Sequence, residues 1–328
     1  MAASIKDVAV RAGVSVGTVS NVLNRPAKVS PATRALVLAA IAELGFVRNS
    51  SAAQLRAGAS RSLGLLVLDM ANPFFQDVAK GVEDVAVQQG YAVLLCNSDE
   101  QASRENWYLQ VLEEQRVRGL LITPVAGGSE RLTALRERGT PAVLVDRTIP
   151  GADCCSVAVD DVAGGELAGA HLMSLGRKRI AYITGPLTLP QCADRLTGLR
   201  RATQGRTVEV AETAALKAGL GYQAALRLFE TTDVDAVFCA NDLLALGVLR
   251  AAISTGRRVP DDVALIGYDD IEFAADAAVP LTSIRQPRIH IGRTAAQLLF
   301  EECDSPADHA HQQVVFKPEL VVRESTRH

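Results

Sequence analysis

Several polar and charged side chains follow directly after apolar runs that are typical of buried strands. Asp69 and Asn72 follow the first such run, Asp146 and Arg147 end the fourth, Asn241 and Asp242 the seventh, and Asp269 and Asp270 the eighth. In an open α/β sheet, the carboxyl ends of parallel strands border the crevice in which ligands bind. Carboxylates, amides and a guanidinium can together hydrogen-bond a molecule rich in hydroxyl groups, such as a sugar. We therefore expect these residues to meet around a small polar ligand.

Three further residues complete the candidate ligand set. Phe74 offers a flat apolar wall for a sugar ring, whereas its neighbour Phe75 is expected in the core. Arg195 is expected to open a helix over RLTGLR, and Gln286 lies in a connection that follows the last apolar run. These side chains add a guanidinium, an amide and an aromatic ring to the polar groups at the strand ends.

The apolar runs alternate with amphipathic helical stretches. They span residues 63–70, 92–99, 119–125 and 142–148 in the first half, and 179–185, 208–213, 236–242 and 263–270 in the second. Near-continuous Val, Ile and Leu indicate strands buried on both faces, and alternation with helices indicates parallel sheets. The chain from about residue 61 is therefore expected to form two Rossmann-like α/β halves.

A different group of polar residues lies within the first 47 residues, where we expect three short helices. Ser4 begins the first in a capping-box pattern, and Ser30-Pro31 opens the third. The second is expected from about Ser15 to Leu23. Two short helices joined by a glycine-containing turn, with a third packed against them, indicate a helix-turn-helix, although any small three-helix bundle would share the pattern.

The charge of the chain is unevenly distributed. Residues 1–60 carry seven basic and two acidic side chains (+5), the remainder carries 27 and 35 (−8), and the whole chain has a net charge of −3. A basic head on an acidic body favours binding of a polyanion by the head. No apolar run approaches the ~20 residues of a membrane helix, and the start has no secretory signal, so we expect a cytoplasmic protein with no membrane partner.

The six cysteines fit the same compartment and are not expected to bind a metal. They form no C-x-x-C pair, and no paired histidines accompany them in the spacing of a zinc site. Several lie in apolar runs, where a free Cys behaves as a small core hydrophobe. The sequence therefore predicts neither a metal site nor a cofactor.

Ordered motifs along almost the whole chain resemble the lactose-repressor (LacI/GalR) family. Residues 5–24, IKDVAVRAGVSVGTVSNVLN, resemble its opening signature, and the core adds GLLVLDMANPFF, GYAVLLCNSDE, AVLVDR, RLTGLR, ANDLLALGVLRAA, VPDDVALIGYDD and LTSIRQP. The resemblance implies an all-α helix-turn-helix head and an α/β two-lobed core like that of periplasmic sugar-binding proteins.

The resemblance also implies where the chain divides. The head is expected at 1–47, a hinge helix and linker at 48–60, and the core, which binds the effector and dimerises, at 61–328. The chain crosses between the lobes three times. The first lobe should therefore take about 61–158 and 287–315, and the second about 159–284 and 316–328.

The resemblance assigns the DNA contacts to the second helix and the hinge. Val16 can offer an apolar contact to a thymine methyl, Gly17 permits close approach, and Asn21 can bond adenine. Leu55 falls at the position of the wedge that enters the minor groove, with an ordinary linker residue as the alternative. Phosphate contacts are expected from Ser15, Thr18, Ser20 and Asn24. At Thr18 and Ser20 the alternative is a solvated helix face.

In the core, the resemblance ranks the candidate ligand contacts. It favours Arg195, Asn241 and Asp269 first, then Asn72, Phe74 and Arg147. Asn241 could instead cap the following helix, and Asp269 could be a turn residue. Asp161 is a further possible contact. Leu216 stands at about the place where the family often has a ring-stacking aromatic residue, so stacking from the second lobe is not expected.

The function implied is a non-enzymatic transcription regulator of the repressor type. Two heads on a symmetric homodimer would read a pseudo-palindromic operator. A small molecule between the lobes, expected to be a sugar or sugar derivative, would alter hinge spacing and so DNA affinity. The alternatives are an effector-independent regulator with a decayed pocket, a transport-type sugar-binding protein, and a Rossmann enzyme. The last would need a G-x-G-x-x-G after a strand or a P-loop, and neither is found.

Overall fold

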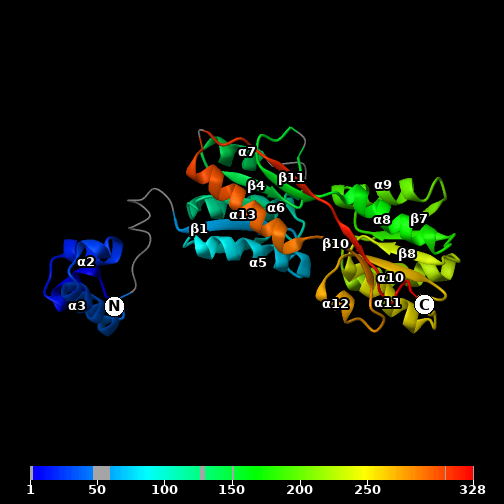
Figure 1. Cartoon of the computed structure of the whole chain (residues 1–328), viewed down its shortest axis with the longest axis horizontal. Coiled ribbons are helices and arrows are strands. Elements are labelled where there is room, and N and C mark those ends of the chain that lie inside the picture. Colours follow the sequence, from blue (N-terminus) through cyan, green and yellow to red (C-terminus); the bar gives the residue numbers. More distant parts are fainter. Residues whose placement is uncertain (1–2, 47–59, 126–129, 150, 307, 328) are drawn as a thin grey trace. The chain divides into compact units, whose positions relative to one another are not determined.

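The computed structural model describes residues 3–46, 60–125, 130–149, 151–306 and 308–327. It divides the chain into two compact units, Met1–Ser60 and Arg61–His328. Figure 1 shows both units and labels many of their elements. The hinge helix predicted within 48–60, with Leu55, lies outside the described residues.

The first unit is a bundle of three helices whose ends are set by local sequence. The helices are Ile5–Ala12 (α1), Val16–Asn24 (α2) and Pro31–Leu44 (α3), with a 3₁₀ turn at Pro26–Lys28 (η1). Ser4 and Asp7 exchange hydrogen bonds at the start of α1, which confirms the predicted capping box. Gly13 ends α1 in the left-handed conformation (φ 67°), and this lets the chain turn sharply into α2.

The core of this unit is small and consists of short side chains. Arg11 and Glu43 form an exposed ion pair at 2.6 Å that joins α1 to α3 and contributes at most about 1 kcal/mol. The buried apolar residues are Val8, Ala9, Val19, Val22, Val37 and Ala40. Because Val19 and Val22 point inward from α2, the other side of that helix is left at the surface.

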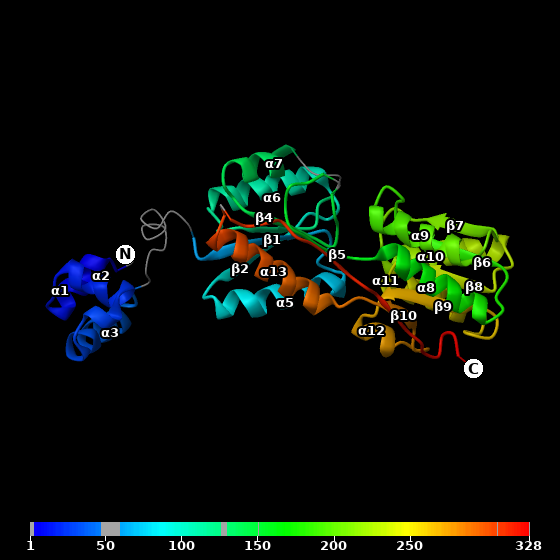
Figure 2. The same ribbon diagram turned by 45° about the horizontal axis from the view of Figure 1, so that its top comes forward.

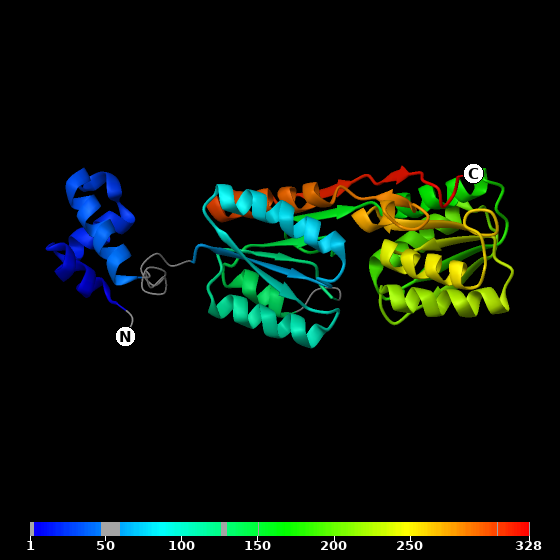
Figure 3. The same ribbon diagram turned by 90° about the horizontal axis from the view of Figure 1, so that it is seen from below.

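The second unit contains two six-stranded sheets, one in each lobe. The first has the order β11-β5-β4-β3-β1-β2, and all its neighbouring strands are parallel. Its strands are Ser62–Val67 (β1), Ala92–Asn97 (β2), Leu120–Ile122 (β3), Ala142–Val145 (β4), Ser156–Val159 (β5) and Gln313–Phe316 (β11). Pro73–Gln88 (α5) and Arg288–Asp304 (α13) cover one face, and Ala102–Glu114 (α6) and Glu130–Glu137 (α7) cover the other, as Figure 3 shows.

The second sheet has the order β12-β10-β9-β8-β6-β7 and is parallel except for β12, which runs antiparallel to β10. Its strands are Ile180–Thr184 (β6), Val208–Glu212 (β7), Ala236–Cys239 (β8), Ala264–Asp269 (β9), Thr282–Arg285 (β10) and Glu319–Val321 (β12). The helices of this lobe are Asp161–Ser174 (α8), Pro190–Ala202 (α9), Ala218–Thr231 (α10), Asp242–Ser254 (α11) and the short Glu272–Ala275 (α12).

The predicted fold class is confirmed, and each of the eight predicted apolar runs overlaps a strand. Four strands were not predicted: β5, β10, β11 and β12. All four lie where the chain leaves or enters a lobe. In β11 exposed and half-buried residues alternate, so no continuous apolar run marks it.

The chain passes between the lobes three times: from β5 into α8, from β10 into α13, and from β11 to β12. Figure 2 shows these connections running from one lobe to the other. Because β5 and β11 are parallel neighbours in the first sheet, two of the crossings leave that sheet side by side.

Apolar side chains fill both faces of each sheet. The first sheet is buried against α5 and α13 in one cluster and against α6 and α7 in another, and the second lobe has a single large cluster that includes Tyr182, Phe238 and Tyr268. Among the described helices, we find none with the length and apolar character of a bilayer span.

Paired glycines let helices on the same sheet pack backbone to backbone. Gly81 of α5 and Gly292 of α13 each face a carbonyl oxygen of the opposite helix, and a Cβ at either position would lie closer than 3.0 Å to it. Gly165 of α8 and Gly198 of α9 make the same reciprocal contact in the second lobe. Helices packed this closely have little freedom to slide past each other, which favours each lobe moving as a rigid body.

Candidate functional site

A pocket between the two lobes brings together most of the residues predicted to bind a ligand. Its volume is about 30 Å³, far below the ~300 Å³ at which small-molecule pockets begin. The lobes are therefore almost closed upon each other. The predicted residues that line the pocket are Asp69, Asn72, Phe74, Arg195, Asn241, Asp269 and Gln286.

Side-chain contacts between the lobes close the pocket. Asn72 in the first lobe donates through Nδ2 to Asp269 Oδ2 in the second at 3.4 Å, and Gln191 in the second donates through Nε2 to Asp146 Oδ2 in the first, also at 3.4 Å. Both hydrogen bonds are long, so each contributes no more than about 1 kcal/mol. A ligand with hydroxyl groups could replace both at little cost.

Unusual backbone conformations gather at the same strand ends. Asp99, Glu100, Asp146, Asp269 and Asp270 all have positive φ, between 51° and 103°. Such conformations are rare outside glycine, cost of the order of 1–3 kcal/mol each, and cluster at functional sites. Three of these residues line the pocket: Glu100 and Asp146 from the first lobe, and Asp269 from the second.

Asp269 is the most heavily engaged carboxylate of the pocket. It ends β9, is 3% exposed, and accepts a hydrogen bond on Oδ1 from Gln286 Nε2 at 2.7 Å. Burial raises its pKa to about 6, with Arg195, Gln286 and Asn72 opposing that rise. Its side chain therefore remains mostly ionised near neutral pH and can accept hydrogen bonds from ligand hydroxyls.

Asp146 also lines the pocket, although the sequence favoured its neighbour Arg147. Burial raises the pKa of Asp146 to about 7, and the nearby Asp161 raises it further while Arg195 and Arg147 lower it. At neutral pH its carboxyl is thus close to half protonated. It can both donate to and accept from a hydroxyl group.

Arg147 is not among the residues that line the pocket. It is buried and donates from Nη1 to the backbone carbonyls of Pro124 and Val125. Its Nε and Nη2 atoms are also buried and have no hydrogen-bond partner among the described residues. Burial lowers the pKa of this guanidinium. Its guanidinium is therefore directed to the backbone at Pro124 and Val125.

Arg195 lies in the middle of α9 rather than at its start. The prediction of a helix opening at RLTGLR was wrong because Pro190, which suits the first position of a helix, begins α9 five residues earlier. Arg195 Nε donates to Asp161 Oδ1 at 2.8 Å, and its guanidinium lies 3.6 Å from the centre of the Tyr268 ring. Asp161, considered as a ligand contact, is instead held by Arg195 and by the Tyr268 hydroxyl at 2.8 Å.

Asn241 combines the two roles that the sequence left open. Its Oδ1 accepts from the backbone N–H of Leu244 at 2.9 Å, so it does cap α11. Its Nδ2 donates to the carbonyl of Leu216 at 3.2 Å. Leu216 itself lines the pocket, at the place where a ring-stacking aromatic residue was missing.

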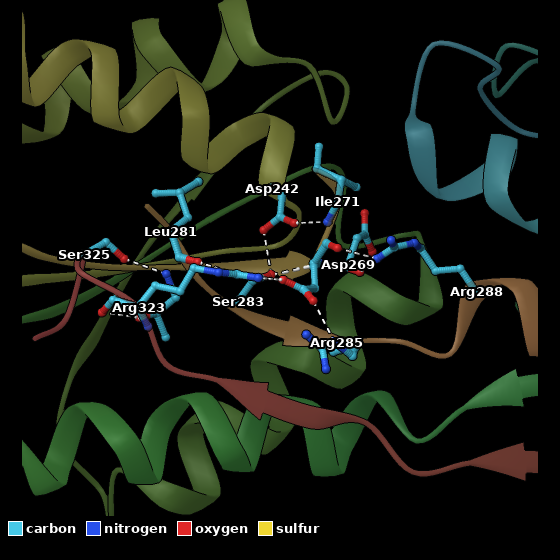
Figure 4. Close-up of polar contacts among 11 residues, drawn as sticks. Asp242, Asp269, Ile271, Leu281, Ser283, Arg285, Arg288, Arg323 and Ser325 are labelled. Atoms are coloured by element: carbon cyan, nitrogen blue, oxygen red, sulfur yellow. Dashed lines mark hydrogen bonds and ion pairs between the residues drawn. The ribbon is translucent and has the colours of Figure 1, made fainter. Parts of the chain in front are cut away.

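A buried polar network supports the pocket from the second lobe, and Figure 4 shows it. Asp242 Oδ1 accepts from Ser283 Oγ at 2.7 Å, and Ser283 Oγ accepts from the backbone N–H of Asp270 at 3.0 Å. The Asp270 carboxylate pairs with Arg285 and Arg323, both at 2.7 Å. Asp242 and Asp270 therefore hold β9, β10 and the C-terminal segment together and do not line the pocket.

Arg288 joins this network to the first lobe. Its Nε donates to Asp77 Oδ2 on α5 at 2.6 Å, and its Nη1 donates to the backbone carbonyls of Asp269 and Asp270 on the second lobe. Because Arg288 begins α13, directly after one of the crossings, it links the end of β9 to that crossing.

Sequence reasoning missed several lining residues. Glu100 follows the second apolar run in the way that Asp69 follows the first, and this position could have identified it. Gln191 carries no such signal, because it lies inside a helix whose start was misplaced. Phe75, expected in the core, is buried but also lines the pocket. Asp146 was named at a strand end but not ranked among the ligand contacts. The other lining residues outside the predicted set are Leu68, Phe75, Glu100, Gln191 and Leu216.

In the head, α2 presents the predicted base-reading residues at the surface. Val16 is 41% exposed, and Gly17 and Asn21 are also exposed. A Cβ at Gly17 would meet only Ser15 Oγ at 3.6 Å, so packing does not require glycine there. This side of α2 is therefore available to another molecule.

The predicted phosphate contacts are partly occupied within α2 itself. Ser15 caps the helix, because its Oγ accepts from the Thr18 backbone N–H at 3.1 Å and lies 2.9 Å from Thr18 Oγ1. Asn24 Nδ2 donates to the backbone carbonyl of Ser20 at 2.8 Å. These bonds hold both ends of α2 and orient polar atoms toward solvent.

Comparisons with known proteins match both units. The family of bacterial regulatory proteins, lacI family, matches residues 4–49, and a periplasmic binding protein-like domain matches residues 170–326. The HTH-type transcriptional repressor PurR of Aliivibrio fischeri (strain MJ11) is 34% identical over 98% of both chains. PurR of Vibrio campbellii is 33% identical over 99% of both.

Solved structures agree with these relatives. The lac repressor dimer bound to operator and the anti-inducer ONPF superposes with a TM-score of 0.86 and 28% identity over 99% of both chains. The transcriptional regulator CelR in complex with cellobiose gives a TM-score of 0.72 and 33% identity, covering 98% of this chain and 99% of CelR. A LacI family regulator from Enterococcus faecium with bound ribose gives 0.75 and 30%, covering 81% of this chain and 98% of the other.

Proposed function

This chain belongs to the lacI family of bacterial regulatory proteins, and we infer from that membership that it is a DNA-binding repressor controlled by a small molecule. Because the relatives that match it from end to end are repressors, it is a regulator and not an enzyme. The proposal that a ligand controls the protein rests on one observation, the convergence of polar side chains in the interlobe pocket. A repressor acts where the chromosome lies, so the expected cytoplasmic location is part of this proposal.

In this proposal α2 reads the operator. Val16, Gly17 and Asn21 form an exposed face, with an apolar group, an open position and an amide that can bond adenine. Hydroxyl and amide groups along α2 can contact phosphates and fix the position of the helix on the DNA. These groups belong to Ser15, Thr18, Ser20 and Asn24.

We further propose that the protein acts as a homodimer on a pseudo-palindromic operator. The lac repressor, which superposes over 99% of both chains, is a dimer in its complex with operator. One head buries too little surface for tight specific binding, whereas two heads on a two-fold axis read two half-sites.

The proposed effector is an uncharged polyhydroxyl compound such as a sugar or nucleoside. The pocket contains the carboxyl groups of Asp69, Glu100, Asp146 and Asp269, whereas the charge of Arg195 is already paired with Asp161 outside the lining. This excess of acidic groups opposes a phosphorylated ligand and suits hydroxyl donors. Structural relatives of this chain hold ribose and cellobiose.

A second candidate function is an effector-independent repressor. It is favoured by the small volume of the pocket, about 30 Å³. Residues of the two lobes hydrogen-bond each other directly across it. Under this alternative the lobes stay closed without a ligand, and DNA affinity does not respond to any added compound.

Operator selection with the purified full-length protein tests these proposals. DNA bound from a random pool should converge on a pseudo-palindrome, and its occupancy should change with an unphosphorylated sugar or nucleoside in a panel that includes the phosphorylated counterparts. The direction of the change identifies the compound as inducer or corepressor. A palindrome without any responder would support the effector-independent repressor, and the absence of a sequence preference at any salt concentration would overturn the assignment of the head.

Paired variants locate each function. Asn21→Ala should relax preference at one operator position, whereas Ser20→Ala should weaken binding about equally at all sequences. Asp269→Asn should abolish the ligand response while operator binding persists, and Glu272→Gln, an exposed carboxylate nearby in sequence, should leave the response intact. A uniform loss with Asn21→Ala, or an unchanged response with Asp269→Asn, would contradict these roles.

A further inference from the structure

A cluster of metal-ligating side chains lies at the edge of the first sheet and shares no residue with the interlobe pocket. Cys155 directly precedes β5, Glu302 lies near the end of α13, and His309 lies in the segment before β11. One potential ligand atom from each lies within 4.8 Å of the other two. The parallel pairing of β5 with β11 brings these distant parts of the sequence together.

The distances suit a shared cation. Cys155 Sγ and His309 Nε2 are 3.1 Å apart. In a tetrahedral zinc site with Zn–S of ~2.3 Å and Zn–N of ~2.0 Å, such atoms lie about 3.5 Å apart. A shift of a few tenths of an ångström would therefore convert this contact into joint coordination of one ion.

Glu302 supplies an independent indication of a missing ligand. Its residue exposure is 8%, and Oε2 is buried without a hydrogen-bond partner among the described residues. A buried carboxylate oxygen without a donor is costly unless a positive charge satisfies it. Oε1 lies 3.5 Å from Nε2 of His311, and Nδ1 of the same ring donates to Asp153 Oδ1 at 2.7 Å. Asp153 and His311 thus form an outer pair that orients the Glu302 carboxylate.

Solvent reaches the cluster from one side. His309 lines a surface hollow of about 550 Å³, together with Phe300 and Gln312. Cys155 is fully buried, and its Sγ also accepts from the Gln312 backbone N–H at 3.3 Å. An ion held here would have protein ligands on the inner side and an open position toward water.

We propose that Cys155, Glu302 and His309 form a binding site for a divalent transition-metal ion. The combination of one thiolate, one imidazole and one carboxylate fits Zn²⁺, which takes S, N and O ligands in tetrahedral geometry, with solvent in the fourth position. His311 is a positioning residue that acts through Glu302. The bound ion would join α13 to the segments that precede β5 and β11, and the chain continues from both strands into the second lobe.

The sequence pointed away from this site, because each ligand comes from a different segment. Metal motifs are recognised by close spacing within one or two short stretches, whereas here the first ligand is separated from the others by most of the second lobe. Cys154, the adjacent cysteine, points the opposite way and packs in the cluster beneath α6 and α7. It provides a matched control.

Titration with Co²⁺, a spectroscopic probe for zinc sites, tests the proposal. Full-length protein freed of metal by a chelator should bind one Co²⁺ per chain with a thiolate-to-cobalt charge-transfer band, which Zn²⁺ abolishes by displacement. Cys155→Ser and His309→Ala should remove the band, and Cys154→Ser should keep it. His311→Ala should keep the band but weaken affinity by about 10–100-fold.

Several results would overturn the site. The wild-type protein would fail the test if it gave no thiolate band, or if Cys154→Ser removed the band as completely as Cys155→Ser. Because Cys155 is buried, its variant must retain the wild-type circular dichroism spectrum. If it does not, His309→Ala decides the question, since this half-buried loop residue can be removed without disturbing the core. Full Co²⁺ affinity in His309→Ala would refute the proposal.

Discussion

The burial of the ion pair between Arg195 and Asp161 predicts a large loss of stability when the arginine is removed. Both side chains are almost completely buried, at 4% and 9% exposure, and Nε and Oδ1 are 2.8 Å apart. In Arg195→Ala, Asp161 loses its only ion-pair partner given by the structure and the carbonyl of Ala240 loses a donor. Tyr268 also loses the guanidinium that lies over its ring.

The magnitude follows from the burial of the pair. Breaking a buried ion pair by removing one partner costs about 3–5 kcal/mol, because the remaining charge is left uncompensated. The other two losses act on the same group and are not added separately. With an unfolding entropy of roughly 2.1 cal/mol/K per residue over residues 61–328, this cost corresponds to a fall in Tm of about 5–9 °C.

Thermal unfolding followed by circular dichroism measures this fall. Arg201→Ala on the same helix is the matched control, because Arg201 pairs with Glu166 at 3.3 Å while both are largely exposed. That pair should contribute less than about 1 kcal/mol, so the control should lose no more than about 2 °C.

A double variant separates the pair from simple loss of packing. In Arg195→Met with Asp161→Asn, no buried charge is left alone, and the amide can still accept from the Tyr268 hydroxyl. The double variant should regain much of the lost Tm. If Arg195→Ala lowered Tm no more than Arg201→Ala, or if the double variant were as unstable as the single one, the buried-charge reasoning would be wrong.

Further predictions concern protonation, packing and capping. The pKa of Asp146, raised to about 7 by burial, means that the folded protein holds a proton that the unfolded chain releases near pH 4. Stability is therefore lost as pH rises from about 4 to 7, by about 4 kcal/mol, and Asp146→Asn should flatten Tm against pH over that range. Gly292→Ala should destabilise by at least about 1–3 kcal/mol, because its Cβ would overlap a carbonyl of α5, whereas Gly219→Ala, with open space around it, should leave Tm unchanged or raised in the same thermal scans. Asn241→Ala should cost about 1–2 kcal/mol through loss of the α11 cap, measured by urea unfolding.

Much of the fold could be predicted because local chemistry and tertiary structure agree. Buried parallel strands require continuous apolar runs, and helix starts require Ser, Asn or Pro at defined positions, so both leave marks in a single sequence. Of the strands at the lobe crossings, β11 and β12 left no such mark. β11 and β12 are held by pairing with strands distant in the chain, and neither has a fully buried face.

Only those pocket residues that directly follow a strand could be predicted from the sequence. Asp69, Asn241 and Asp269 follow strands directly, so their convergence is a consequence of parallel topology. Gln191 reaches the pocket from within a helix, and nothing in its neighbourhood distinguishes it from a surface residue. Arg147 follows a strand as the others do, but its side chain turns toward the carbonyls of Pro124 and Val125.

The three crossings also limit how this chain can be cut, shuffled or exchanged. Because each lobe is assembled from stretches that are separated in the sequence, no single contiguous segment encodes either lobe. A protease that nicked one crossing would leave the lobes covalently joined by the other two, so the core should persist as one particle in a native gel. By contrast, the boundary near residue 60 is passed by the chain once. Recombination between relatives can therefore transplant a head with one junction, whereas the two lobes have to be inherited together.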